Sequence, residues 1–578
     1  MAATESPFND ILHTNAVPTN EQCDDIRTYL NPIREKLAQA DAEIVRLREL
    51  LGTAIEKRDA LQMVVSAHDA LVSPMRRIPD DVLGAIFLET LPERRNTALH
   101  ATEGPLLLVQ VCRYWRDLAY SLPRLWASMH VVVGDAADDV EAVGCVLSEI
   151  PSWLKRSGAV PLAVTIVPFR RVPARLPEIT TTRTVLKILL PEVKRWRDIQ
   201  LTLLGMENLN ALGLHTLTAD DVPQLVKFDL NFSGRPPIPQ QPLFNFLSTP
   251  TLRKLSFVGH YNMLSASIAW QNLQAIHIHF AASDTSIRIP FPYPFLSRCT
   301  SAEKLSLSIS GNLVYSTGDL HPVQLPLVTI LHLSLYDHGE TKVGRLLHNL
   351  EMPALHTLCI WDIQSVQPRS LFESPNYAGI KCLVFPASNI ASTELYAILA
   401  MLPLLERLRL LGEPTIPVLP SEVHQNKTDG EFLSRFVLDA ASTAHSPLCP
   451  SLQHLELIGW RHTSHELILR LLRSRTPPTN NSPHTMHIVV KPLTAFNAFI
   501  FRDRLTHTLA HQNKLDLEKE LSENIACGLK LKLCYQGPVN VVVYSRLRGT
   551  ERDPTSTQAR FTQPEHEWLQ DFAPASFL

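Results

Sequence analysis

The stretch PTLRKLSF, residues 250–257, carries the pattern that decides the fold. A proline opens it, and apolar residues follow at the second, fifth and seventh positions after that proline. Eight other segments repeat this apolar spacing, mostly at intervals of 21 to 29 residues. They are PQLVKFDL from Pro223, QNLQAIHI from Gln271, TSAEKLSL from Thr300, PLVTILHL from Pro326, PALHTLCI from Pro353, AGIKCLVF from Ala378, PLLERLRL from Pro403 and PSLQHLEL from Pro450. A period of this length is the signature of a repeat protein.

Each repeat is predicted to supply one short strand whose alternating apolar residues point into a core shared with its neighbours. The segment KRWRDIQL from Lys194 is a degenerate earlier copy, and TELYAILAMLPLL, residues 393–405, is predicted to return as a helix. The interval of 47 residues before Pro450 predicts an insertion. A large β-sandwich is the alternative architecture. Regular spacing favours instead an irregular solenoid of short parallel strands with helical or coil returns, over residues 131–545.

The C-terminal part of that solenoid is predicted to cap its open end. TMHIVVKP (485–492) and VNVVVYSR (539–546) have the composition of strands. HELILRLLRS (465–474) and LTHTLAHQNKLDLEKEL (505–521) have a helical pattern. Residues 546–578 are mostly polar and are predicted to form a flexible tail.

Apolar residues also repeat every seven positions between residues 30 and 73, where only Arg58 and His68 interrupt the two seams. The seams consist of Leu30, Leu37, Ile44, Leu51, Arg58, Val65 and Val72, and of Ile33, Ala40, Leu47, Ala54, Leu61 and His68. This pattern predicts a long coiled-coil helix after a disordered leader, residues 1–29. Two interpretations stay open: pairing with another helix, such as a homodimer through residues 30–72, or a single helix that folds back on its own domain.

The composition excludes several classes of protein. The net charge of −3 over 578 residues creates no strong field, so neither nucleic acid nor a membrane surface is an expected partner. The nine cysteines are scattered, which is typical of a reducing compartment rather than of a secreted disulfide framework. No apolar run reaches the ~18 residues of a membrane span, and the N-terminus does not resemble a signal peptide. We therefore expect a cytoplasmic or nuclear protein.

Sequence traces of catalysis are weak. There is no glycine-rich dinucleotide or phosphate loop and no Gly-x-Ser-x-Gly motif. His462, His465 and Glu466 do not have metalloprotease spacing, and Cys527 and Cys534 lack companion zinc ligands, so both cysteines are interpreted as strand residues. We expect no cofactor, no metal and no enzymatic activity. A thiol-dependent hydrolase using Cys112 is the weakest hypothesis, because that cysteine lies on an apolar stripe and is expected to be buried.

Residues 74–130 have a different character from the rest. Ile78 and Pro79 lead into a short helix that ends at Pro92, and a polar loop, PERRNTALHATEG, follows. A second helix is predicted from residue 106 until Pro123. Its apolar stripe consists of Leu108, Val111, Cys112, Trp115, Leu118 and Leu122. The segment then runs through RLW and becomes extended.

This segment resembles an F-box, through IPDDVLGAIF, VCRYW and RLW in that order. With the N-terminal helix and the leucine-rich body, the chain looks like the F-box proteins with leucine-rich repeats that are expanded in mushroom-forming fungi. The resemblance implies the fold class: α/β, with a long N-terminal coiled-coil helix, a small all-α F-box and a leucine-rich-repeat solenoid.

The resemblance also implies a partner. An F-box binds a Skp-type adaptor, which links it to a cullin and the ubiquitin machinery. The contact residues implied by the match are Ile78, Pro79, Val82, Leu83, Ile86, Phe87, Val111, Cys112, Trp115, Leu118 and Trp126. Some of these side chains must also hold the helices of the segment together.

The expected function is therefore a non-catalytic substrate-recognition subunit of a cullin-RING ubiquitin ligase, with the repeats binding an unknown protein substrate. The alternative is a coiled-coil scaffolding protein whose F-box-like segment takes no part in ubiquitination.

Overall fold

The computed structural model describes residues 6–93, 95–133, 140–168, 176–204, 212–233, 244–259, 267–280, 289–291, 294–310, 313–315, 322–336, 349–363, 372, 377–387, 390–412, 432–438, 448–460, 465–475, 491–501 and 517–536. The chain divides into two units, residues 1–85 and residues 86–578.

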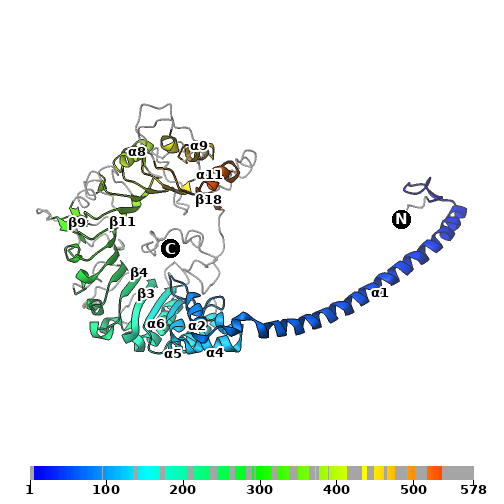
Figure 1. Ribbon diagram of the computed structural model, residues 1–578, viewed down its shortest axis with the longest axis horizontal. Helices are drawn as coiled ribbons and strands as arrows, with labels where there is room; N and C mark the ends of the chain where they lie inside the picture. The colour runs from blue at the N-terminus through cyan, green and yellow to red at the C-terminus, as the bar shows by residue number, and fades with distance from the viewer. Residues whose placement is uncertain are drawn as a thin grey trace. The chain divides into compact units, whose positions relative to one another are not determined.

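The second unit is an α/β repeat solenoid built on one parallel sheet of 14 strands, which are neighbours in space in the order of the sequence. The strands are β1 (Ser128–Val133), β2 (Leu162–Pro168), β3 (Trp196–Leu204), β4 (Lys227–Ser233), β5 (Lys254–Gly259), β6 (Ala275–Phe280), β8 (Lys304–Ser310), β11 (Ile330–Tyr336), β13 (Thr357–Ile363), β14 (Cys382–Pro386), β15 (Arg407–Leu411), β16 (His454–Trp460), β17 (Ala495–Phe501) and β18 (Lys530–Gln536). They follow one another along an arc (Figure 1).

The repeat pattern places the strands correctly. In all nine copies the strand begins at the fourth position after the first residue of the motif, as at Lys254 in the copy that starts at Pro250. Every residue at the second, fifth and seventh positions is buried, as Leu252, Leu255 and Phe257 are. The prediction of a solenoid is confirmed.

Backbone hydrogen bonds show why the strand starts are aligned. In the turn before each strand, the carbonyl of the third motif position accepts hydrogen bonds from the same turn of the next repeat. Gln274 N donates to Arg253 O at 2.8 Å, and Glu303 N donates to Gln274 O at 2.8 Å. This row continues to Gln453 O, which accepts from Thr494 N at 2.8 Å. The turns are therefore paired as fully as the strands they open.

The returns between the strands are short helices, 3-10 turns and coil. Helices of the second unit outside its N-terminal segment are α5 (Val140–Arg156), α6 (Leu176–Leu189), α8 (Ser392–Ala400), α9 (His465–Arg475), α10 (Leu517–Glu520) and α11 (Ser522–Ala526). Helices α8 and α9 lie outside the arc of strands (Figure 1). Two pairs of very short strands, β7 (Ile289–Phe291) with β9 (Leu313–Tyr315) and β10 (Val323–Gln324) with β12 (Leu350–Glu351), form separate small sheets.

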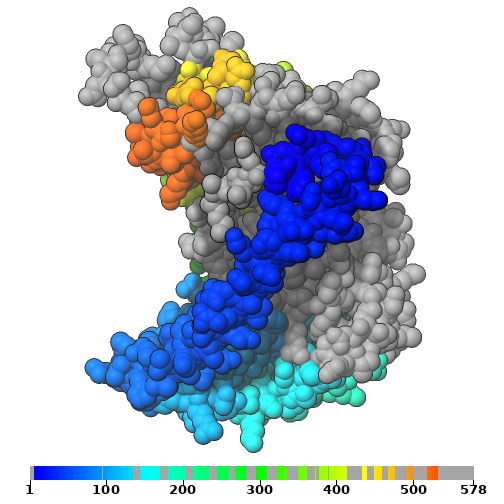
Figure 2. Space-filling view, turned by 90° about the vertical axis from the view of Figure 1, so that its right-hand side faces the viewer, coloured from blue at the N-terminus to red at the C-terminus, as the bar shows by residue number. Residues whose placement is uncertain are grey.

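The last two returns, between β16 and β17 and between β17 and β18, contain helices. Helix α9, in yellow, lies beside α10 and α11, in orange (Figure 2). Arg473 of α9 donates to the carboxylate of Glu520 at 2.8 Å. Cys534 lies in β18 as predicted. The prediction that Cys527 is a strand residue is wrong, because Cys527 follows the last turn of α11. Most of the predicted strands 485–492 and 539–546 and the tail 546–578 lie outside the described residues.

The first unit is dominated by α1 (Asn20–Val72), a helix of 53 residues. Thr19 caps it, because its hydroxyl accepts from Gln22 N at 3.3 Å while the Gln22 side chain accepts from Thr19 N at 2.9 Å. The predicted long helix is confirmed. Its start is a correction, since the helix takes in residues 20–29 of the predicted leader.

The predicted second helix of the segment 74–130 is also corrected. It is broken into α3 (Leu108–Val111) and α4 (Arg113–Ser121). Cys112 between them has extended backbone angles, φ −160° and ψ 171°, and its Sγ accepts from Trp115 N at 3.5 Å as the cap of α4. Cys112 therefore acts as a helix cap, a role that the apolar periodicity of the segment does not reveal.

Candidate protein-interaction surfaces

The helical segment comprises α2 (Asp80–Glu89), α3, α4 and the 3-10 turn η2 (Pro123–Trp126), and the division between the two units falls within α2. Its predicted partner-binding residues differ in exposure. Leu83, Phe87 and Trp126 are buried; Ile78, Trp115 and Leu118 are half-buried; Pro79, Val82, Ile86, Val111 and Cys112 are exposed. The exposed side chains are available to a partner, whereas the buried ones act through the packing of the segment.

Trp126 holds this segment to the first return helix of the solenoid. Its ring meets that of Trp153 edge-on, with centroids 4.9 Å apart, and its Nε1 donates to Ala119 O at 2.8 Å. The guanidinium of Arg156 lies over the same ring, 4.6 Å from its centroid. Aromatic and cation–π contacts of this kind stabilise a buried tryptophan beyond the area it covers.

Phe87 and Trp115 form a second internal contact, with ring centroids 4.8 Å apart, that joins the end of α2 to α4. With Phe87 inside, neighbouring apolar residues remain outside: Ile86 is 41% exposed and Val111 is 55% exposed. Leu107 and Tyr114 are exposed as well, and sequence reasoning missed both. Neither residue belongs to the apolar stripe that the sequence predicts, so the periodic pattern does not select them.

The loop between α2 and α3 is not the simple polar loop that its composition predicts. Asn96, Thr97, Ala98, Leu99 and Glu103 are all buried. Thr97 O accepts from His130 N at 2.7 Å, and Ala98 forms a parallel bridge with His130 of β1. The loop therefore pairs with the free edge of β1 through this single bridge and covers the N-terminal end of the sheet.

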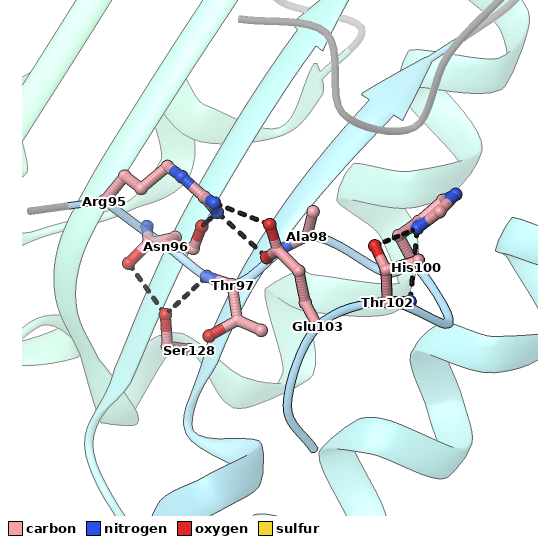
Figure 3. A network of polar contacts seen from close by, with 8 residues as sticks. All are labelled: Arg95, Asn96, Thr97, Ala98, His100, Thr102, Glu103 and Ser128. Carbon is pink, nitrogen blue, oxygen red and sulfur yellow. Dashed lines mark hydrogen bonds and ion pairs between the residues drawn. The ribbon is translucent and has the colours of Figure 1, made fainter. Parts of the chain in front are cut away.

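Side chains fasten this loop in place (Figure 3). Arg95 donates to both oxygens of Glu103, at 3.0 and 2.5 Å, and a Glu103 oxygen also accepts from Ala98 N at 3.0 Å. Ser128 Oγ donates to Asn96 Oδ1 at 3.0 Å and accepts from Thr97 N at 3.1 Å. A buried ion pair with these extra hydrogen bonds fixes the loop in one arrangement.

Along the sheet, a row of side chains lies at the sixth motif position, between the two inward apolar positions. The register aligns Asp229, Ser256, His277, Ser306, His332, Cys359, Val384, Arg409 and Glu456, and continues to Asn497. Most of these residues are polar, and they belong to the face opposite the core because side chains alternate along a strand. In the sequence this row is the middle letter of FDL, LSF, IHI and LEL, and most of its side chains are buried.

Neighbours in this row bond to each other. His277 Nδ1 and Ser306 Oγ are 2.7 Å apart. Arg409 donates to Glu456, which also accepts from Asn497 Nδ2 at 2.9 Å. Burial raises the pKa of Asp229 to about 6, and burial lowers the pKa of His277 to about 3, so both positions favour the neutral form.

The fourth motif position, on the same face, is a lysine or arginine in four of the nine copies. Lys254 and Lys530 are exposed there, and Lys227, Lys304 and Arg407 are half-buried. Lys227 is 3.4 Å from a carboxylate oxygen of Asp198 in the adjacent strand. This edge of the strand face is therefore suited to negatively charged groups.

Within the described residues no group of histidine, cysteine and acidic side chains could hold a metal ion, and no helix is long and apolar enough to cross a membrane. His462 lies outside those residues. Cys112 is exposed, so its predicted burial is wrong. The reason is again the extended break at this residue. No family model and no curated protein matches this chain.

Proposed function

We propose that this protein is a non-catalytic substrate-recognition subunit of a cullin-RING ubiquitin ligase, of the F-box and leucine-rich-repeat type. In this proposal residues 74–130 bind a Skp-type adaptor and the strand face of the solenoid binds a protein target. The protein would act in the cytoplasm or nucleus, where that machinery works. Its contribution to the rate would be proximity between a target lysine and a ubiquitin carrier.

One observation carries the proposal. Four apolar side chains of the F-box-like helices, Ile86, Leu107, Val111 and Tyr114, are between 41% and 55% exposed, although Phe87 beside them is fully buried. Large apolar side chains left in water on a small helical segment are typical of a surface that a partner covers. The order of the motifs IPDDVLGAIF, VCRYW and RLW supports an F-box adaptor as that partner.

The target would bind elsewhere. The lysine and arginine side chains at the fourth position recur along the strand face, so they offer contacts suited to an acidic segment of a protein.

The test is binding of the full chain to a purified Skp-type adaptor, measured by calorimetry. Val111→Asp should weaken binding by at least about thirtyfold, because it places a charge in a covered apolar contact. Leu404→Asp is the matched control, since Leu404 is 50% exposed but lies in a solenoid turn. Equal adaptor binding by both variants, or no binding by the unaltered chain, would overturn the proposal.

A scaffolding protein is the second candidate, and the loop around Glu103 favours it. Because this loop is built into the edge of the sheet, the helical segment has a structural use as the N-terminal cap of the solenoid, which needs no adaptor. Absence of adaptor binding by a correctly folded chain would support this candidate.

A further inference from the structure

We infer that α1 pairs with α1 of a second copy of this chain as a parallel, in-register, two-stranded coiled coil. This inference is independent of the adaptor and of the target. Its first support is exposure: seven apolar residues of the heptad seams are between 44% and 67% exposed, namely Ile33, Leu37, Ile44, Leu47, Leu51, Leu61 and Val65. A stripe of this length along one helix face is stable only when another apolar surface covers it.

The residues flanking the seams identify the partner as the same helix in the same direction. In a parallel coiled coil, the residue that immediately precedes each seam residue of the Leu30 series faces, on the other helix, the residue five positions later in the sequence. Lys36 would then face Asp41 of the second copy, and Glu43 would face Arg48. Both pairs have opposite charges, and the two-fold symmetry makes each of them twice.

The next flanking pairs are also compatible. Leu50 would face Ile55 of the second copy, an apolar match, and Lys57 would face Gln62. Leu50 and Ile55 are 53% and 40% exposed in the single chain, so the same pairing covers both. No flanking pair of the parallel arrangement between residues 36 and 69 brings like charges together.

An antiparallel pair fits less well. In an antiparallel pair, the flanking residues on one side of the seams, such as Lys36, face residues of the same kind on the other helix. The flanking residues on the other side, such as Asp41, also face one another, so Lys36 never meets Asp41. With the greatest overlap of residues 30–72, Leu50 would face Lys57 and Ile55 would face Arg48. Each of these pairs places a charged group against an apolar one, which the parallel arrangement does between residues 36 and 69 only where Val64 faces Asp69. The charge pattern therefore favours the parallel direction.

Arg58 interrupts the seam and bonds to its neighbour Asp59. In the parallel pair two Arg58 side chains would meet in one layer, which lowers affinity while holding the register, as polar seam residues do. Arg58→Leu should therefore strengthen association of the full chain.

Sedimentation equilibrium of the full chain tests the pairing. We expect twice the chain mass of 64.9 kDa. Lys36→Glu should raise the dissociation constant of the dimer roughly tenfold, because the introduced glutamate of each copy would then face Asp41 of the other. Adding Asp41→Lys should restore the original dissociation constant. Neither residue has a charged neighbour three or four positions away in its own helix, so rescue reports contact between copies. A monomer at tens of micromolar, or no rescue by the double change, would overturn the inference.

Cross-linking tests the direction and register separately. Ala40 lies in the seam and Ala38 on the outer face, and both are exposed in the single chain. In a chain with Cys23→Ser, Ala40→Cys should give a covalent dimer with a short bismaleimide, whereas Ala38→Cys should give only the background of the unsubstituted control. Equal cross-linking by the two variants would contradict a parallel seam at Ala40.

Discussion

Replacing Trp126 with alanine should open the N-terminal end of the solenoid without affecting its middle. Trp126 is fully buried, packs on Trp153 and lies under Arg156. A tryptophan buries about 200 Å², worth ~5 kcal/mol at 25 cal/mol per Å², and this is an upper estimate because unfolded chains already cover some surface. Large-to-small changes of tryptophan usually cost about 3 to 5 kcal/mol. We therefore expect a loss of about 4 kcal/mol in the free energy of local opening.

Hydrogen exchange followed by mass spectrometry measures this opening directly. A loss of about 4 kcal/mol corresponds to exchange roughly a thousandfold faster, and peptides from α4, β1 and α5 should show it. Peptides from β13 to β15 should be unchanged, because each repeat contacts only its neighbours.

The matched control is Trp270→Ala. Trp270 is also buried and stacks on Phe295, with ring centroids 4.3 Å apart, but it lies beside β6. Its replacement should speed exchange around β5, β6 and β8 instead. Unchanged protection of β1 in Trp126→Ala would refute the role assigned to Trp126. Equal acceleration in every strand would refute the independence of the repeats.

Three further outcomes are expected. Burial raises the pKa of Asp229 to about 6, so folding favours its protonated form, and this contribution to stability is full below pH 4 and is lost as the pH rises through 6. Asp229→Asn should therefore make the denaturant midpoint of unfolding less dependent on pH between 4 and 6. An unchanged pH dependence of the midpoint would contradict the assignment. Cys112 is exposed, as are Cys145 and Cys527, whereas Cys449 is buried with its pKa raised to about 12. Iodoacetamide should therefore label Cys112 before Cys449 in the folded chain, and equal labelling of these two would count against the fold. Arg475 is buried and donates to the carbonyl oxygens of Phe436, Cys449 and Leu448. Arg475→Met should therefore destabilise the C-terminal repeats by about 3 kcal/mol, measured by thermal unfolding. An unchanged unfolding temperature would show that water replaces these hydrogen bonds.

The segment 74–130 was predictable in outline only. Its short helices and both tryptophans follow from apolar periodicity and proline, but the division of its side chains between core and surface does not. Phe87 and Ile86 are adjacent and similarly apolar, yet one is buried and the other exposed. That difference depends on Trp115, a residue of another helix, and no local pattern records it.

The sequence by itself determined the solenoid, the positions of its repeated strands and the long helix over residues 30–72. It could do so because inward apolar positions recur at short fixed intervals, and each repeat needs only its neighbours to complete its core. Tertiary structure alone decided that the loop at Ala98 pairs with His130 and that Trp126 packs on Trp153. These contacts join segments about 30 residues apart with no repeat to relate them, so their geometry depends on how the whole end of the sheet is covered.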